Sequence, residues 1–181
     1  MPISSRVVCS LAVALAVGPF VMRAQDAPQT GFRADFLRQL TDVQKKFTSL
    51  AEAMPQDKYG WRPGEGVRSV SEVYTHIAGA NYFLLSFAGV KPPAGLDRNM
   101  EKTVTQKAKV VEELNKSFGY VRHAVLNMSD ADLEKPAKLF GRSTDVEEVY
   151  FVMANHMHEH LGQSIAYART NGVVPPWSAK P

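Results

Sequence analysis

Apolar side chains recur three and four residues apart along most of this chain of 181 residues. That spacing matches the 3.6-residue turn of an α-helix and differs from the two-residue repeat of a strand. It extends over four segments: residues 32–50, Ser69 to Leu84, residues 104–128, and about Thr144 to Tyr167. No convincing alternating pattern separates them, and residues 129–142 are expected to be a connection. The sequence therefore predicts an all-α four-helix bundle.

The three connections between these segments each hold about ten residues or more. Connections of this length can cross over the bundle, whereas very short ones force neighbouring helices to be antiparallel. The apolar pattern therefore predicts the fold class and leaves the order and direction of the helices open.

The first 24 residues are typical of an export signal. Arg6 supplies a positive charge, residues 7–21 are almost wholly apolar, and Ala24 precedes a polar stretch. The apolar run is shorter than a membrane-spanning helix needs. We expect a signal peptide over residues 1–24, a mature domain over 25–181, and a periplasmic or secreted protein without stable membrane insertion. An uncleaved N-terminal anchor is the alternative.

Cleavage at this point would remove Cys9, which is the chain's one cysteine. The mature domain would then have neither a disulfide nor a thiolate for catalysis or metal binding. The formal net charge of the full chain is +3 and no run of basic residues occurs, so nothing in the composition favours nucleic acid. No glycine-rich loop follows a strand, which excludes the usual nucleotide-binding fingerprints. The five histidines remain as candidates for chemistry.

His156 and His160 are four residues apart on the apolar face of the last predicted helix. Residues at this spacing lie on one helix face, about 6 Å apart. Two buried imidazoles lose hydration and repel each other when charged, and a divalent metal resolves both problems by binding their neutral nitrogens. The alternative is one histidine hydrogen-bonded in the core and one at its edge.

His76 flanks the apolar stripe of the second predicted helix and offers a third ligand. Three histidines leave positions open for water or substrate, as in catalytic zinc sites. Glu72, one turn earlier, can orient the ring of His76 or can simply cap its own helix. Gln163 can contact a bound water or satisfy a backbone group. The other two histidines, His123 and His158, are expected to lie outside the site.

The residues from His156 to His160 also spell H-x-x-E-H, a zinc-protease motif in which the glutamate acts as a base. A protease of this kind needs a further acidic ligand downstream, and residues 161–181 contain no Asp or Glu. This argues against a protease. Glu159 stays a candidate for an extra ligand or base because it lies beside His156.

Two blocks of this sequence resemble the DinB-like superfamily, which is also called YfiT-like. The first is Trp61-Arg62-Pro63 with Arg68-Ser69-Val70-Ser71-Glu72-Val73, His76-Ile77 and Asn81, and the second is His156-x-x-x-His160-x-x-Gln163. The resemblance covers residues 31–177. It implies a four-helix bundle of unusual connectivity, often dimeric, with a divalent metal bound by three histidines. The ligands of the family fall on His76, His156 and His160.

Characterised members of this superfamily include thiol-dependent S-transferases and a thiol-dependent maleylpyruvate isomerase, and many members have no known activity. Those relatives act in the cytoplasm, and this chain departs from them by its export signal. Because a fold does not determine a reaction, the resemblance leaves the chemistry open.

These observations together predict an exported metalloprotein that binds one divalent ion, zinc or nickel, through three histidines. The prediction is an enzyme acting on a small molecule, either a hydrolase or a thiol-type transferase. Trp61, Tyr74 and Tyr82 can line the approach to the metal. A non-catalytic binding module that the metal stabilises is the alternative, and a homodimer is expected from the resemblance.

Overall fold

The computed structural model describes residues 27–178, and four long helices form its main body. They are α1 (Gly31–Ala53), α2 (Val70–Phe87), α4 (Lys107–Leu126) and α6 (Val146–Thr170). The shorter elements are η1 (Gln56–Lys58), α3 (Met100–Thr103), α5 (Asp130–Leu133), β1 (Pro136–Leu139), β2 (Arg142–Asp145) and η2 (Pro176–Ser178). The predicted four-helix bundle is confirmed. The predicted signal peptide lies outside the described residues.

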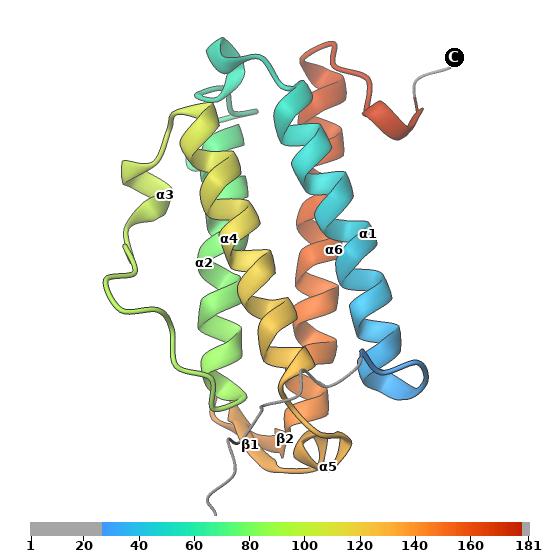
Figure 1. Ribbon diagram of the computed structural model, residues 1–181. Helices are drawn as coiled ribbons and strands as arrows, with labels where there is room; N and C mark the ends of the chain where they lie inside the picture. The colour runs from blue at the N-terminus through green and yellow to red at the C-terminus, as the bar shows by residue number, and fades with distance from the viewer. Residues whose placement is uncertain (1–26, 179–181) are drawn as a thin grey trace, which may run out of the picture.

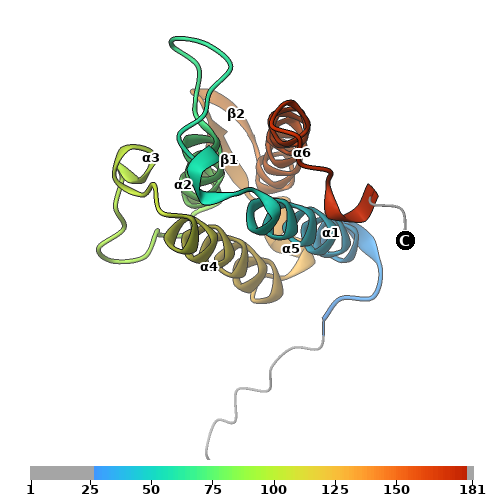
Figure 2. The same ribbon diagram turned by 90° about the horizontal axis from the view of Figure 1, so that it is seen from above.

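The four long helices do not follow one another around the bundle. α1 and α2 are consecutive in sequence, yet each packs against both α4 and α6, so that α1 and α2 occupy diagonal corners (Figure 2). In Figure 1, α1 and α6 run upwards while α2 and α4 run downwards. The neighbours α2 and α4 are therefore parallel. Their connection, residues 88–106, has to return along the outside of the bundle, and it carries α3 (Figure 1).

The apolar stripes predicted from the sequence form the core. Phe36, Leu40, Val43, Phe47 and Leu50 of α1 are all buried. The ring of Phe47 lies 6.2 Å from that of Tyr74 on α2 and 6.0 Å from that of Phe118 on α4, measured between centroids. Tyr74 is thus a core residue and does not line an approach to the histidines. Among the described residues, no helix is long and apolar enough to cross a membrane.

The segment predicted to be a plain connection after α4 folds into α5 and an antiparallel hairpin of β1 and β2. Leu139 pairs with Arg142 across a two-residue turn, where Phe140 and Gly141 have φ angles of 49° and 86°. Two positive φ angles are typical of the tight turn that joins two short strands. Strands of four residues are too short to show an alternating pattern in the sequence.

The helix predicted to begin near Val104 begins three residues later. Val104 ends the short helix α3 in an extended conformation, with φ −106° and ψ 96°, and α4 starts at Lys107. The apolar repeat runs across this break because Met100 of α3 and Val110 of α4 are both buried. A repeat that continues through two separate helices cannot show where one ends.

Candidate metal centre

His76 from α2 meets His156 and His160 from α6 where these two helices pack together. One ring nitrogen from each histidine lies within 4.8 Å of the other two. The Nε2 atoms of His76 and His156 are only 3.2 Å apart. All three side chains are half-buried, so the group is reachable from one side. The structure therefore brings together the three residues that the sequence predicted as metal ligands.

Caps at the start of both helices fix the position of these histidines along the bundle. The side chain of Ser69 accepts a hydrogen bond from the backbone of Glu72, and the carboxylate of Glu72 accepts one from the backbone N–H of Ser69 at 2.8 Å. This reciprocal pair satisfies two backbone donors at the beginning of α2. At the beginning of α6, Asp145 accepts from the backbone N–H of Glu148 at 2.9 Å. Each helix thus begins at a defined residue.

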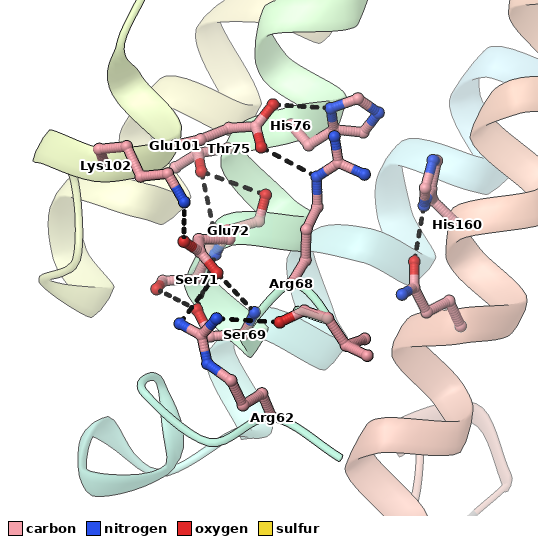
Figure 3. A network of polar contacts seen from close by, with 12 residues as sticks. Arg62, Arg68, Ser69, Ser71, Glu72, Thr75, His76, Glu101, Lys102 and His160 are labelled. Carbon is pink, nitrogen blue, oxygen red and sulfur yellow. Dashed lines mark hydrogen bonds and ion pairs between the residues drawn. The ribbon is translucent and has the colours of Figure 1, made fainter. Parts of the chain in front are cut away.

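Glu101, from the short helix α3, holds the ring of His76. Its carboxylate accepts a hydrogen bond of 2.8 Å from Nδ1 of His76 and one of 2.9 Å from Nε of Arg68 (Figure 3). Partial burial raises the pKa of Glu101, but the hydrogen bonds from Arg68 and His76 outweigh it and the pKa is lowered overall. Glu101 is therefore ionised at neutral pH. Because Nδ1 of His76 carries the proton, its Nε2 presents a lone pair to the other histidines.

A second chain of hydrogen bonds holds the ring of His160. Nδ1 of His160 donates to Oε1 of Gln163 at 2.7 Å, and Nε2 of Gln163 donates to the hydroxyl of Tyr167 at 2.9 Å. That hydroxyl donates in turn to the backbone carbonyl of Arg68 at 3.1 Å. Arg68 therefore takes part in both series of hydrogen bonds: its side chain donates to Glu101, and its backbone carbonyl accepts from Tyr167.

The environment of His76 and His156 favours their neutral forms. Burial, followed by the nearby positive charges of His160, His76 and Arg68, lowers the pKa of His156 to about 4. Burial also lowers the pKa of His76, although the hydrogen bond to Glu101 opposes the change. Nδ1 of His156 is buried without a hydrogen-bond partner among residues 27–178. Neutral imidazoles whose Nε2 atoms face each other at 3.2 Å fit a divalent cation, since each can direct a lone pair toward it.

Glu72 does not contact His76, and the capping role is the one that the structure shows. Besides capping α2, its carboxylate accepts a hydrogen bond of 2.6 Å from Lys102 and pairs with Arg62 at 3.1 Å. Hydrogen bonds from Lys102 and from the backbone of Ser69 lower the pKa of Glu72 to about 2. The orienting role considered for Glu72 is filled by Glu101. No spacing rule identifies Glu101, because only the crossover between α2 and α4 brings it to His76.

The remaining candidate residues lie around or outside the three-histidine group. Glu159 is exposed and does not belong to that group. Trp61 is half-buried, and its ring and that of Tyr167 pack edge to face with centroids 5.3 Å apart. It therefore contacts one member of the series of hydrogen bonds that holds His160. His123 and His158 are exposed and lie apart from the group, as expected.

A cavity of about 500 Å³ begins beside His76 and Glu101. One wall is the outer face of α2, including Gly79 and Tyr82, and the other is the returning segment of residues 92–101. Tyr82, which the sequence placed near the approach, therefore does line a space next to the histidines. The arrangement places a three-histidine group that could hold a metal ion next to a cavity of the size that small molecules occupy.

The comparisons with known proteins identify the family. The sequence model of the DinB superfamily matches residues 39–164. A DinB-like protein from Bacillus cereus is 21% identical, with a TM-score of 0.67, and the match covers 78% of this chain and 93% of that one. A search of curated proteins finds no match.

Two Bacillus subtilis proteins have the same fold. The DinB-like protein YjoA is 14% identical with a TM-score of 0.62, covering 77% of this chain and 94% of its own. YfiT, described as a probable metal-dependent hydrolase with an unusual four-helix bundle topology, is 16% identical with a TM-score of 0.63, covering 87% of this chain and 97% of its own. The family match extends over most of the bundle, including all three histidines, and the fold agrees with it. The chain therefore belongs to the DinB superfamily.

Proposed function

We propose that this protein is a metal-dependent hydrolase that binds one divalent ion, zinc or nickel, through His76, His156 and His160. The observation that carries the proposal is the convergence of three half-buried imidazoles, one of which, His76, also lines a cavity. A divalent ion at such a site acts as a Lewis acid that polarises a substrate carbonyl and makes water nucleophilic at neutral pH. The description of YfiT as a probable metal-dependent hydrolase supports the same reaction class.

The residues around the histidines prepare them for this role. Glu101 and Gln163 accept hydrogen bonds from Nδ1 of His76 and His160. Because the proton is then on Nδ1, Nε2 of both rings carries a lone pair that can bind a metal ion. A ligand ring whose second nitrogen is hydrogen-bonded keeps its tautomer and its orientation. Arg68 holds both acceptors in place, directly for Glu101 and through Tyr167 for Gln163. These links pre-organise two of the three ligands.

Elemental analysis of protein purified without a histidine tag tests the metal site. We expect about one divalent ion per chain in the wild type and its loss in His76→Ala and His160→Ala. His158→Ala is the matched control, because His158 is on the same helix, is exposed and lies outside the group. Unchanged metal content in His76→Ala would refute the site.

Activity assays then test the reaction. The metal-loaded protein is expected to hydrolyse members of an ester and amide panel, with loss of turnover on chelation and recovery on adding the ion back. A rate that depends on added thiol would instead indicate transfer. Metal that binds and raises the melting temperature, with no turnover under either condition, would indicate the non-catalytic binding module.

We also propose that the protein is exported, on the basis of the apolar segment of residues 7–21 behind Arg6. Mass analysis of the protein from a periplasmic extract tests this, and a mature N-terminus at Gln25 is the expected result. Recovery of the full-length chain from the membrane fraction would support the uncleaved anchor.

A further inference from the structure

The cavity beside His76 is long and follows one helix. On α2 its wall extends from Thr75 to Ser86, a distance of about 16 Å along the helix axis. The opposite wall is the returning segment from Pro92 to Glu101. Its volume of about 500 Å³ is within the range of small-molecule sites. The cavity adjoins the three-histidine group, because His76 belongs to both.

Gly79 keeps the middle of this cavity open. It lies within α2, where glycine is unfavourable, and it is not among the glycines with positive φ. A Cβ atom at this position would meet only Sδ of Met100, at an ordinary contact distance of 3.9 Å. Neither backbone conformation nor close packing therefore requires glycine here. A larger side chain would project toward the space between α2 and α3.

The cavity combines apolar walls with the guanidinium of Arg98, which is unpaired among the described residues. Ala80, Phe83, Leu96 and Met100 supply apolar surface, and Phe83 is 55% exposed at the rim. Arg98 also lines the cavity, and it has no ion pair or hydrogen bond with any other residue of 27–178.

Both acidic residues on the cavity wall already have partners of their own. Asp97 accepts hydrogen bonds from Thr103 and from the backbone of Asn99. Glu101 accepts from His76 and Arg68. Neither carboxylate is paired with Arg98 among the described residues, and the planar guanidinium of Arg98 is suited to binding a carboxylate through two hydrogen bonds.

We propose that this cavity is the substrate site, that its occupant is a carboxylic acid with an apolar body, and that Arg98 binds the carboxylate. The proposal rests on the proposed function, because it places the reacting part of the occupant at the three histidines. Gly79 and Phe83 would contact the apolar body. Arg98 would then act as the specificity-determining residue.

Binding of 4-phenylbutyrate and of its uncharged amide to the metal-free protein tests this proposal by calorimetry. Without metal, the carboxylate can bind only to protein groups. We expect the acid to bind the wild type about tenfold more tightly than the amide, the effect of one charge-assisted contact. Arg98→Ala should remove that difference and leave amide binding unchanged. Gly79→Leu should weaken both ligands, because its side chain fills the cavity.

Gly119→Leu is the matched control, since Gly119 is an exposed glycine of α4 and a Cβ atom added to it would have nothing within 4 Å. It should leave both affinities unchanged. The proposal is overturned if the acid does not bind the wild type, if Gly79→Leu binds both probes as the wild type does, or if the preference for the acid survives Arg98→Ala. Acid binding that occurs only after zinc loading and ignores Arg98→Ala would overturn it too, because the carboxylate would then be a metal ligand.

Zinc content separates this proposal from the proposed function. Arg98→Ala and Gly79→Leu should bind zinc as the wild type does, because neither residue belongs to the three-histidine group or to the hydrogen bonds that hold it. A wild type that binds no zinc contradicts the hydrolase proposal. Normal zinc content together with probe binding that neither variant changes contradicts only the assignment of the cavity.

Discussion

Nδ1 of His76 donates a hydrogen bond of 2.8 Å to the carboxylate of Glu101, although the two residues are 25 positions apart and belong to different helices. This contact joins the bundle to the segment that returns outside it from α2 to α4. Arg68 binds the other oxygen of the same carboxylate at 2.9 Å, so Glu101 is held from both sides. One carboxylate therefore links the three-histidine group to the wall of the adjacent cavity.

Glu101→Gln is expected to lower zinc affinity by about tenfold, because carboxylates that orient ligand histidines typically contribute at least that much. Glutamine keeps the size of the side chain and loses the charge that holds Arg68 and the Nδ1 proton of His76. Zinc titration against a chromophoric chelator measures the change. Glu159→Gln is the control and should bind zinc normally, since Glu159 is exposed and outside the group. Equal zinc affinity in Glu101→Gln and wild type would contradict the positioning role.

Tyr167→Phe is expected to weaken zinc binding less than Glu101→Gln does, by about two- to fivefold. The hydroxyl of Tyr167 holds Gln163, which in turn holds His160, so its effect on the metal passes through one more residue. The loss of its hydrogen bonds should also lower the free energy of unfolding by about 1 kcal/mol.

Tyr150→Phe provides the comparison for that variant. Tyr150 is a buried tyrosine of the same helix whose ring packs against Phe36, with centroids 5.1 Å apart. Removing its hydroxyl should leave zinc affinity unchanged. If both tyrosine variants lose zinc affinity equally, the effect comes from a general destabilisation of α6. The hydrogen bonds that link His160 to Arg68 would then have no role in positioning the metal ligand.

The helices and the shared face of His156 and His160 were predictable because both depend on local spacing, and His76 was singled out because it flanks the apolar stripe of another predicted helix. A 3.6-residue repeat marks a buried helix face whatever the helix packs against, and His156 and His160 share a face for the same reason. Glu101 and Arg68 were not predictable as partners of His76. Their meeting depends on the parallel arrangement of α2 and α4, which forces the intervening segment back along the bundle. Local spacing carries no information about that path.

The hairpin after α5 offers a test of the turn that the sequence did not reveal. Gly141 has a φ of 86°, a conformation that side chains other than glycine rarely adopt. Gly141→Ala should therefore lower the free energy of unfolding by about 1 kcal/mol. Gly119→Ala is the same substitution within an exposed part of α4 and should raise it by up to about 1 kcal/mol, because alanine favours the helix. Urea unfolding measures both, and equal signs would contradict the turn geometry.

Glu72→Gln separates the capping of α2 from metal binding. Glu72 caps the helix and pairs with Lys102 and Arg62, so its substitution should lower the free energy of unfolding by about 1–2 kcal/mol at pH 7. Zinc affinity should stay at the wild-type level, because Glu72 does not contact His76. Glu112→Gln, on the exposed side of α4, should leave the free energy of unfolding close to the wild-type value.

The difference in free energy of unfolding between wild type and Glu72→Gln, called the stability gap below, should decrease as the pH falls. Hydrogen bonds from Lys102 and from the backbone of Ser69 lower the pKa of Glu72 from 4.5 to about 2. A carboxyl whose pKa is lowered by folding stabilises the protein only while it is ionised. The gap should therefore be constant above pH 4.5, narrow as the pH falls from 4.5 toward 2, and vanish below that. Urea unfolding of both metal-free proteins at intervals across this range measures it, and a gap that widens as the pH falls would show that Glu72 is not held as an ionised cap.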